Sequence, residues 1–149
     1  MRMVIQRVLN AEVAIEGKVH ASIGPGLLVL VGFEAEDNAA TLEKMAHKLV
    51  KMRLFGDADG KMNLDIQQVQ GELLIVSQFT LYADIKKGNR PSFIQAAPPA
   101  IAQALYNQFI GVCEQVLGKH ISTGVFGADM KVRLLNDGPV TIMADSNNL

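Results

Sequence analysis

The chain has 149 residues, of which 49% are hydrophobic and 19% charged, and its formal net charge is −1 at pH 7. This composition is typical of a globular protein and excludes a disordered chain, and the near-neutral charge excludes a strong general attraction to nucleic acid. The single cysteine, Cys113, excludes an intrachain disulfide and a cysteine-rich metal site. The length fits one unit, so we expect residues 1–149 to form a single domain.

The sequence contains no apolar run near the roughly 20 residues that span a bilayer, so we expect no membrane contact. Residues 1–8 lack the long apolar core and the small-residue cleavage site of a signal peptide. We therefore expect a cytoplasmic protein.

The first half of the chain predicts four strands and one helix. Alternating or continuous apolar residues predict strands at 3–8, 11–15, 19–23 and 27–33, with Asn10 at a bulge or turn. Apolar residues then recur at helical spacing and predict a helix over about 38–53, for which Asp37 is a suitable N-cap.

The second half predicts a buried strand, a long helix and two final strands. The strand covers residues 72–79, and the helix begins near Pro98 and Pro99 and ends at Gly118. Cys113 falls on the apolar stripe of this helix, which favours a buried thiol. Two apolar segments, 132–135 and 140–143, flank a predicted turn at residues 136–139.

These elements predict an α+β domain with mostly antiparallel sheets and two long helices. The apolar faces of the sheets must meet, so the sheets are expected to curl or stack. The strands at 27–31 and 73–76 lack clean alternation, which predicts that both of their faces are covered.

The strongest candidate site begins where the apolar run 73–76 stops at Ser77-Gln78-Phe79-Thr80. A rigid strand that ends in hydroxyl, amide and backbone N–H groups can hold a substrate in a fixed geometry. We expect its partner to be Asn136-Asp137-Gly138-Pro139-Val140-Thr141, although each stretch alone is typical of a strand end or a hairpin turn.

The residue types favour a site built from neutral donors. Ser77 and Thr80 are candidate nucleophiles, but no motif ties His20, His47 or His120 to them as a base. Amide, hydroxyl and backbone donors can instead stabilise the oxyanion that forms when an ester is attacked. The segment 57–60 lacks the further ligands of a calcium loop, and cofactor fingerprints are absent, so we expect no metal and no cofactor.

Two motifs, Ser77-Gln78-Phe79-Thr80-Leu81 and Asn136-Asp137-Gly138-Pro139-Val140-Thr141, stand in the order and context found in one known family. Segments 4–8, 60–64, 90–93 and 126–130 show the same likeness. On these residues the chain resembles the bacterial-type D-aminoacyl-tRNA deacylases from Met1 to about Ala144.

The resemblance implies a homodimer of barrel-like subunits with each active site near the dimer interface. It implies a hydrolase that cleaves the ester between a D-amino acid, or glycine, and the 3′ end of tRNA. Such an enzyme rejects L-aminoacyl-tRNA, recycles tRNA and keeps D-residues out of translation.

The resemblance also implies residue roles. Gly138 and Pro139, joined by a cis bond, would enter the partner's site and exclude L-amino acids, with Arg7 bracing them; from the residues alone, a trans proline in a plain turn is the simpler interpretation. Ser77, Gln78 and the Phe79 backbone would hold the ester carbonyl, with Thr80 as a positioning residue. Phe126 and Met130 would line a pocket for the terminal adenosine.

Two other classes of function stay open on the sequence. The first is a non-catalytic RNA-binding dimer that uses the basic segment 86–90. The second is a different esterase, with Thr80 or Ser77 as a covalent nucleophile.

Overall fold

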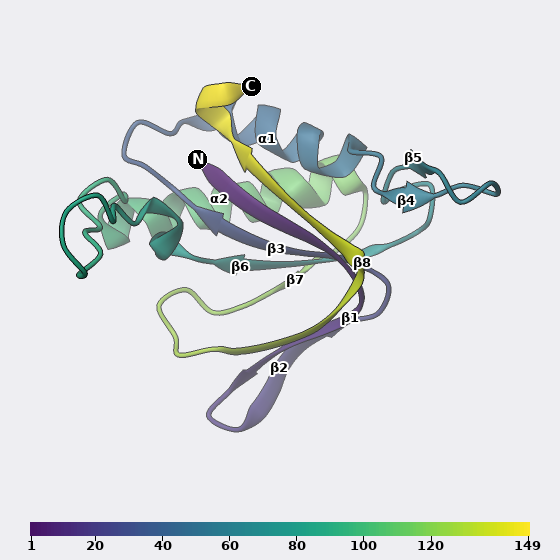
Figure 1. Ribbon diagram of the computed structural model, residues 1–149, viewed down its shortest axis with the longest axis horizontal. Coiled ribbons are helices and arrows are strands. Elements are labelled where there is room, and N and C mark those ends of the chain that lie inside the picture. Colours follow the sequence, from purple (N-terminus) through teal and green to yellow (C-terminus); the bar gives the residue numbers. More distant parts are fainter.

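A computed structural model describes residues 1–149 as one mixed sheet, a small two-stranded sheet, two α-helices and two short 3-10 helices (Figure 1). In chain order the elements are β1 (Arg2–Ile15), β2 (Lys18–Ile23), β3 (Gly26–Gly32), α1 (Ala39–Lys51), β4 (Phe55–Gly56), β5 (Met62–Leu64), β6 (Glu72–Ser77), η1 (Phe79–Tyr82), α2 (Pro99–Leu117), β7 (Ser122–Thr123), β8 (Lys131–Asp145) and η2 (Ser146–Asn148).

The main sheet has the order β2-β1-β3-β6-β7, and β8 lies along β1. Strand β1 pairs antiparallel with β2, β3 and β8, whereas β6 pairs parallel with both β3 and β7. The expected α+β class and the mostly antiparallel pairing are therefore confirmed, and the parallel pairs of β6 make the main sheet mixed. The reason is the connection from β3 to β6, which passes through α1 and returns the chain in the same direction.

Strands β1 and β8 hold the sheet together and give it a curled, barrel-like form. One half of β1 pairs with β3 and the other half with β2, while β8 follows β1 along most of its length (Figure 1). Each is one long strand where the sequence predicts two. The predicted irregularity at Asn10 is confirmed as a register shift between Val8 and Asn10 in the pairing with β8.

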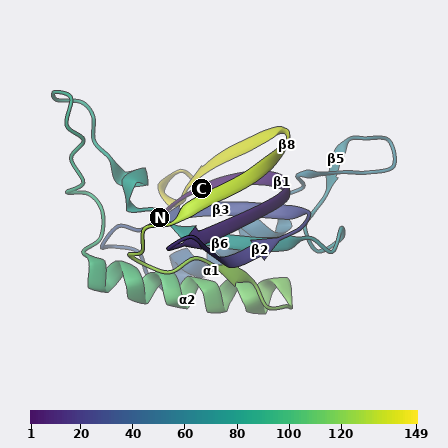
Figure 2. The same cartoon turned by 90° about the horizontal axis from the view of Figure 1, so that it is seen from below.

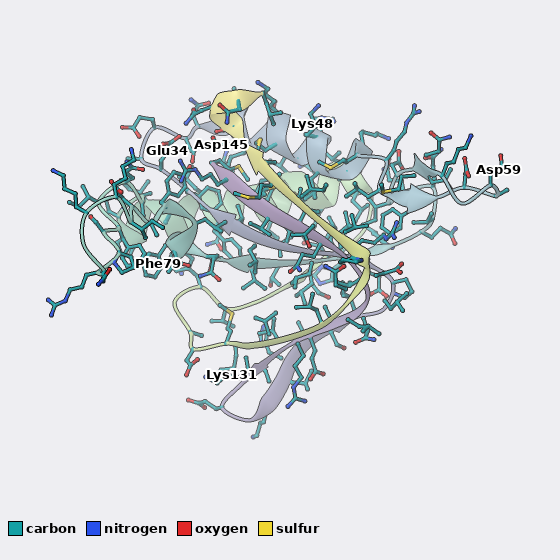
Figure 3. The ribbon with its side chains drawn as sticks, in the orientation of Figure 1. Glu34, Lys48, Asp59, Phe79, Lys131 and Asp145 are labelled. Atoms are coloured by element: carbon teal, nitrogen blue, oxygen red, sulfur yellow. The ribbon has the colours of Figure 1, made fainter.

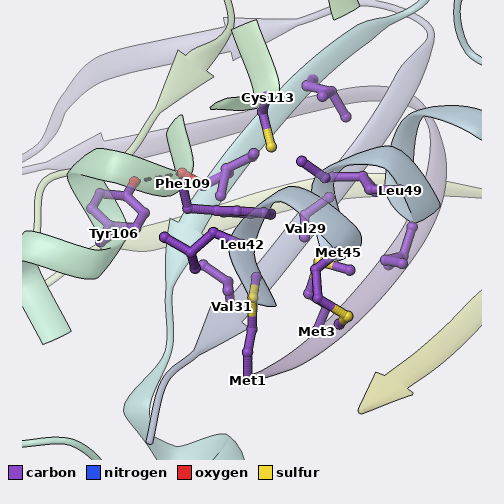
Figure 4. Packing of buried hydrophobic residues seen from close by; sticks show 14 of the residues in the cluster. Met1, Met3, Val29, Val31, Leu42, Met45, Leu49, Tyr106, Phe109 and Cys113 are labelled. Carbon is purple, nitrogen blue, oxygen red and sulfur yellow. Dashed lines mark hydrogen bonds between the residues drawn. The ribbon is translucent and has the colours of Figure 1, made fainter. Parts of the chain in front are cut away.

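Both faces of the central strands are buried, as the lack of alternation predicts. Leu27, Val29 and Ile75 pack with α1 and α2 in the larger core (Figure 4), whereas Leu28 and Leu74 face a second, smaller core on the opposite side. Figure 2 shows the two helices on one side of the sheet. This arrangement fixes β6 firmly, so the residues at its end have a rigid base.

The helix ends follow local hydrogen bonding. Asn38, not the predicted Asp37, is the N-cap of α1, and its side-chain oxygen accepts from Thr41 N at 3.2 Å. Asp37 instead accepts from Glu34 N at 2.9 Å and from the Met1 amino group at 2.7 Å. The predicted end of α2 is confirmed, because Gly118 has a left-handed φ of 82°.

The Cys113 thiol is fully buried in the larger core, as its place on the apolar stripe predicts. Burial raises its pKa to about 12, so the thiol stays protonated at neutral pH. Neither α-helix combines the length and the apolar character that crossing a bilayer requires.

Candidate functional site

The end of β6 and the turn after it carry the first motif. Ser77 is the last residue of β6 and lies opposite Val31 of β3. Gln78 N donates to Val31 O at 2.7 Å, which extends the sheet by one bond before the chain turns into η1. The side-chain amide of Gln78 donates to the Thr80 hydroxyl, so these two polar side chains form one unit.

The start of η1 leaves backbone donors free within the turn. Its first hydrogen bond runs from Leu81 N to Gln78 O at 3.3 Å. The N–H groups of Phe79 and Thr80 precede that bond and have no acceptor in the turn, as at any helix start. They therefore lie next to the Ser77 hydroxyl and the Gln78 amide as additional donors.

A cavity of about 650 Å³ opens beside this motif. Its wall combines the polar end of β6 with apolar side chains from the segment before α2 and from the segment between β7 and β8. The lining residues are Val76, Ser77, Gln78, Phe79, Phe93, Ala96, Ala97, Pro98, Pro99, Ala102, Phe126, Gly127, Ala128, Asp129, Met130 and Val132. A volume of this size suits a nucleoside-sized ligand.

Aromatic contacts shape the apolar walls. The rings of Phe79 and Phe93 lie edge to face with their centroids 5.0 Å apart, and Phe126 lies 6.1 Å from Tyr106. Figure 3 shows Phe79 at the outer edge of the fold, beside the turn that follows β6. Phe79 is 57% exposed, so its ring can contact a ligand or another chain.

Tyr106 of α2 ties the helix to the strand that carries the site. Its hydroxyl donates to Ile75 O at 2.7 Å in a buried position. Burial raises the pKa of Tyr106 to about 12, so the phenol stays a neutral donor at pH 7. The bond fixes β6 against α2 two residues before Ser77.

The cavity wall contains no histidine and no cysteine, and its only ionisable residue is Asp129. The Asp129 carboxylate is 84% exposed and pairs with Lys131 at 2.9 Å. His20, His47 and His120 are all exposed and lie outside the wall. The wall therefore offers neutral hydrogen-bond donors. Of the two predicted nucleophiles, Ser77 lines the cavity and Thr80 does not, and the wall places no histidine or cysteine beside Ser77.

No group of three or more His, Cys, Asp or Glu side chains is arranged to hold a metal ion. The acidic segment 57–60 has a local role instead. Both oxygens of Asp57 accept hydrogen bonds, from Asp59 N at 2.9 Å, Lys61 N at 3.0 Å and Asn63 Nδ2 at 3.0 Å. These bonds close the turn between β4 and β5.

Arg2 of β1 and Gly32 of β3 determine the position of η1. Arg2 Nη1 donates to Leu81 O at 3.0 Å, and the guanidinium lies 4.4 Å from the centroid of the Tyr82 ring. At Gly32, a Cβ would lie 2.9 Å from Gln78 O and 3.3 Å from the Leu81 Cβ, so only glycine lets η1 approach β3 this closely.

Gly32→Ala is therefore expected to push η1 and Gln78 out of position. We expect kcat for the reaction proposed below to fall about 10- to 100-fold, because misplacing catalytic groups by about 1 Å has effects of this size. Gly111→Ala is the matched control, because a Cβ at this α2 position meets nothing within 4 Å. The measurement is kcat of both folded variants in steady-state kinetics. A Gly32→Ala enzyme with full kcat would refute this role of Gly32.

The second motif lies within β8, not in a hairpin turn, so the predicted turn is wrong. The Asn136 side chain makes two hydrogen bonds within this motif. Its Oδ1 accepts from Val140 N at 2.8 Å, and its Nδ2 donates to Thr141 Oγ1 at 3.1 Å. The Gly138–Pro139 bond is cis, which corrects the plain trans turn and agrees with the family resemblance. Both residues are exposed.

Arg7 contacts this motif directly. Its Nε donates to Asp137 O at 3.0 Å, and its Nη1 donates to Leu54 O at 2.6 Å. An ion pair of 3.4 Å joins Arg7 to the Asp137 carboxylate. The side chain thus links the motif to the segment after α1.

Within one chain the two motifs are not brought together. Val8 of β1 pairs with Asn136 and with Gly26, which in turn pairs with Glu72 at the far end of β6 from Ser77. Three strand spacings across the sheet and five residues along β6 separate the two motifs. Accordingly, neither Gly138 nor Pro139 lines the cavity, whereas Phe126 and Met130 do.

The sequence prediction missed the wall formed by Phe93 and by the segment from Ala96 to Pro99. These residues lie in a loop without periodic apolar spacing, so no pattern assigns them to a site. The available signal was the Pro98-Pro99 pair, which marks the start of α2 and so the place where the loop returns to the sheet.

The fold and the cavity define an α+β protein whose site combines neutral donors with an apolar pocket. Comparison with known proteins identifies the family: residues 4–145 match the family D-Tyr-tRNA(Tyr) deacylase. The chain is 53% identical to a D-aminoacyl-tRNA deacylase of Flavobacterium johnsoniae and 55% identical to one of Cytophaga hutchinsonii, each time over 99% of both chains. The chain belongs to this deacylase family, as its motifs predict.

Solved structures agree with this assignment. A structure described as c-Myc DNA Unwinding Element Binding Protein superposes with a TM-score of 0.93 at 40% identity, covering 97% of this chain and 98% of the other. A second, described as a probable eukaryotic D-amino acid tRNA deacylase, has a TM-score of 0.81 at 20% identity, with 96% and 97% covered, and so supports the fold alone.

Proposed function

We propose that the chain hydrolyses the ester that links a D-amino acid, or glycine, to the terminal adenosine of tRNA, and that it rejects L-aminoacyl-tRNA. Membership of the deacylase family supports the reaction class. The observation that carries the proposal is the cavity, where donors from Ser77, Gln78 and the start of η1 face an apolar pocket. We place the protein in the cytoplasm, where its substrate is used, and treat residues 1–149 as one domain.

In the proposed complex the adenosine lies against Phe126 and Met130, since apolar and aromatic side chains favour the faces of unpaired bases. The ester carbonyl accepts hydrogen bonds from the Ser77 hydroxyl, the Gln78 amide and the Phe79 N–H. These donors stabilise the oxyanion that forms when water attacks the carbonyl carbon. Thr80 holds the Gln78 amide in position through their hydrogen bond.

The proton path needs no protein base in this scheme. The adjacent ribose hydroxyl of the substrate relays the proton from the attacking water to the ribose oxygen that leaves. The carbonyl–oxygen bond then breaks and releases the free amino acid and intact tRNA. The wall of the cavity, which lacks histidine and cysteine, supports this route over a covalent one.

We further propose a homodimer in which Gly138 and Pro139 of one subunit enter the partner's cavity and exclude L-side chains, with Arg7 as their brace. Two features support this arrangement: Gly138 and Pro139 are exposed, and neither of them lines the cavity of its own chain. Exclusion of the wrong hand by a rigid group gives selectivity that attractive contacts rarely reach.

The test is hydrolysis of one tRNA charged separately with D-tyrosine and L-tyrosine, on protein whose mass is measured by sedimentation equilibrium. We expect a two-chain mass and loss of the D-ester at least about 100-fold faster than the L-ester, a ratio that discrimination by pocket shape can reach. Equal loss of both esters would sink the rejection role of Gly138 and Pro139. Stability of both would instead favour the non-catalytic RNA-binding dimer.

A further inference from the structure

The loop at residues 85–91, which we call the basic loop, leaves the fold directly beside the cavity. Gln78 and Phe79 line the cavity before the loop, and Phe93 lines it afterwards. The loop is closed at its base by two backbone bonds, Asp84 N to Ser92 O at 2.8 Å and Ser92 N to Asp84 O at 2.9 Å. Figures 1 and 2 show this segment projecting away from the sheet and α2.

The basic loop carries uncompensated positive charge. Lys86, Lys87 and Arg90 are exposed, and none of them takes part in an ion pair. The acidic residue just before the loop, Asp84, accepts a hydrogen bond from the Lys86 backbone N–H at 2.9 Å. Three cations therefore face solvent on a loop that contains no carboxylate of its own, in a chain whose net charge is −1.

The part of the cavity wall between β7 and β8 differs in charge from the basic loop. It contains Asp129, which forms an ion pair with Lys131 at 2.9 Å, so this part of the wall is locally neutral. Figure 3 shows Phe79 and Lys131 on separate segments at this end of the molecule. A polyanion that leaves the cavity is attracted toward the basic loop, since each phosphate gains from a neighbouring Lys or Arg.

We propose that the basic loop binds the phosphate backbone of the tRNA acceptor end as it leaves the cavity. This inference rests on the proposed function, because the position of the terminal adenosine in the cavity sets which phosphates come next. The loop supplies affinity for the body of the nucleic acid, while the donors at Ser77 and Gln78 act on the ester. A neutral protein thus binds a polyanion through one local patch.

The test compares the wild-type enzyme with a variant carrying Lys86→Ala, Lys87→Ala and Arg90→Ala on two substrates. With D-tyrosyl-tRNA, we expect the variant to lose about 10- to 100-fold in kcat/KM at about 50 mM salt, mainly through KM. The slope of log kcat/KM against log salt should become shallower by about 2 to 3, because three phosphate contacts are removed. With D-tyrosyl-adenosine, which has no phosphates, both enzymes should react equally.

A second triple variant, Lys18→Ala, Lys48→Ala and Lys119→Ala, is the matched control, because it removes the same charge from three exposed residues outside the cavity wall. An unchanged KM for D-tyrosyl-tRNA in the loop variant would overturn the proposal. So would an equal loss in both triple variants, or an equal loss on both substrates.

If the wild-type enzyme cleaves neither substrate, the proposed function fails, and binding of uncharged tRNA followed by fluorescence anisotropy decides the role of the loop separately. A weaker affinity and a shallower salt slope in the loop variant then support it, and identical binding overturns it.

Discussion

Gln78→Ala is expected to lower kcat for D-tyrosyl-tRNA by about 100- to 1,000-fold, the usual effect of removing one donor from an oxyanion site. Gln78 follows the last residue of β6, lines the cavity and donates from its side chain to Thr80. Its backbone N–H remains bonded to Val31 O at 2.7 Å, so the truncation removes the amide while the turn keeps its anchor.

The loss should fall on kcat and leave KM nearly unchanged, because the oxyanion exists only after attack on the ester. Gln78→Glu refines the test, since it keeps the size of the side chain but removes both amide donors and adds a negative charge. We expect it to be at least as impaired as Gln78→Ala. Gln108→Ala, at an exposed position of α2, is the control for loss of a glutamine. A Gln78→Ala enzyme within threefold of the wild-type kcat would contradict the role of this amide.

The sequence predicts the parts of this molecule whose pattern is local. The spacing of apolar residues identifies both helices and the buried strands. Gly118 marks the end of α2 because the backbone there is left-handed, a conformation that glycine adopts readily. The abrupt change from apolar to polar residues at Ser77 identifies the polar wall of the cavity. Local hydrogen bonding also explains the one-residue error at the start of α1, where Asp37 closes a loop and leaves the capping to Asn38.

Tertiary pairing decides the parts that the sequence does not predict. Residues 136–139 have the composition of a turn, yet β1 pairs with β8 at Asn136 and again at Thr141, so the strand continues past them. The same kind of long-range contact makes the sheet mixed, since β3 and β6 meet only after α1. Phe93 and the residues before α2 reach the cavity through this topology, which no local pattern records.

The two family motifs indicate a function, which the spacing of apolar residues alone does not. They separate a catalytic interpretation of Ser77 and Gln78 from an ordinary strand end, because both motifs occur together in the expected order. The structure adds that the motifs lie far apart in one chain, which is why a second subunit enters the proposed mechanism. It also shows that Arg7 contacts Asp137 O at 3.0 Å, the arrangement that a bracing role needs.

Removal of the 2′-hydroxyl from the terminal ribose of the substrate is also expected to slow hydrolysis strongly. The cavity offers no histidine or cysteine, and Asp129, its one acid, is mostly exposed and paired with Lys131. If no side chain can take the proton of the attacking water, the ribose hydroxyl next to the ester must assist. General acid–base assistance contributes about 100- to 10,000-fold, so its removal should cost a factor in that range.

The role of the ribose hydroxyl is tested by single-turnover hydrolysis of D-tyrosyl-tRNA that ends in 2′-deoxyadenosine, with the amino acid on the 3′-hydroxyl. A tRNA with the deoxy sugar at the penultimate nucleotide is the control. We expect a rate at least about 100-fold below that of the ribose substrate, with the control unaffected. Hydrolysis at the ribose rate, together with an acyl group trapped on Thr80 or Ser77, would contradict this role and identify a covalent esterase.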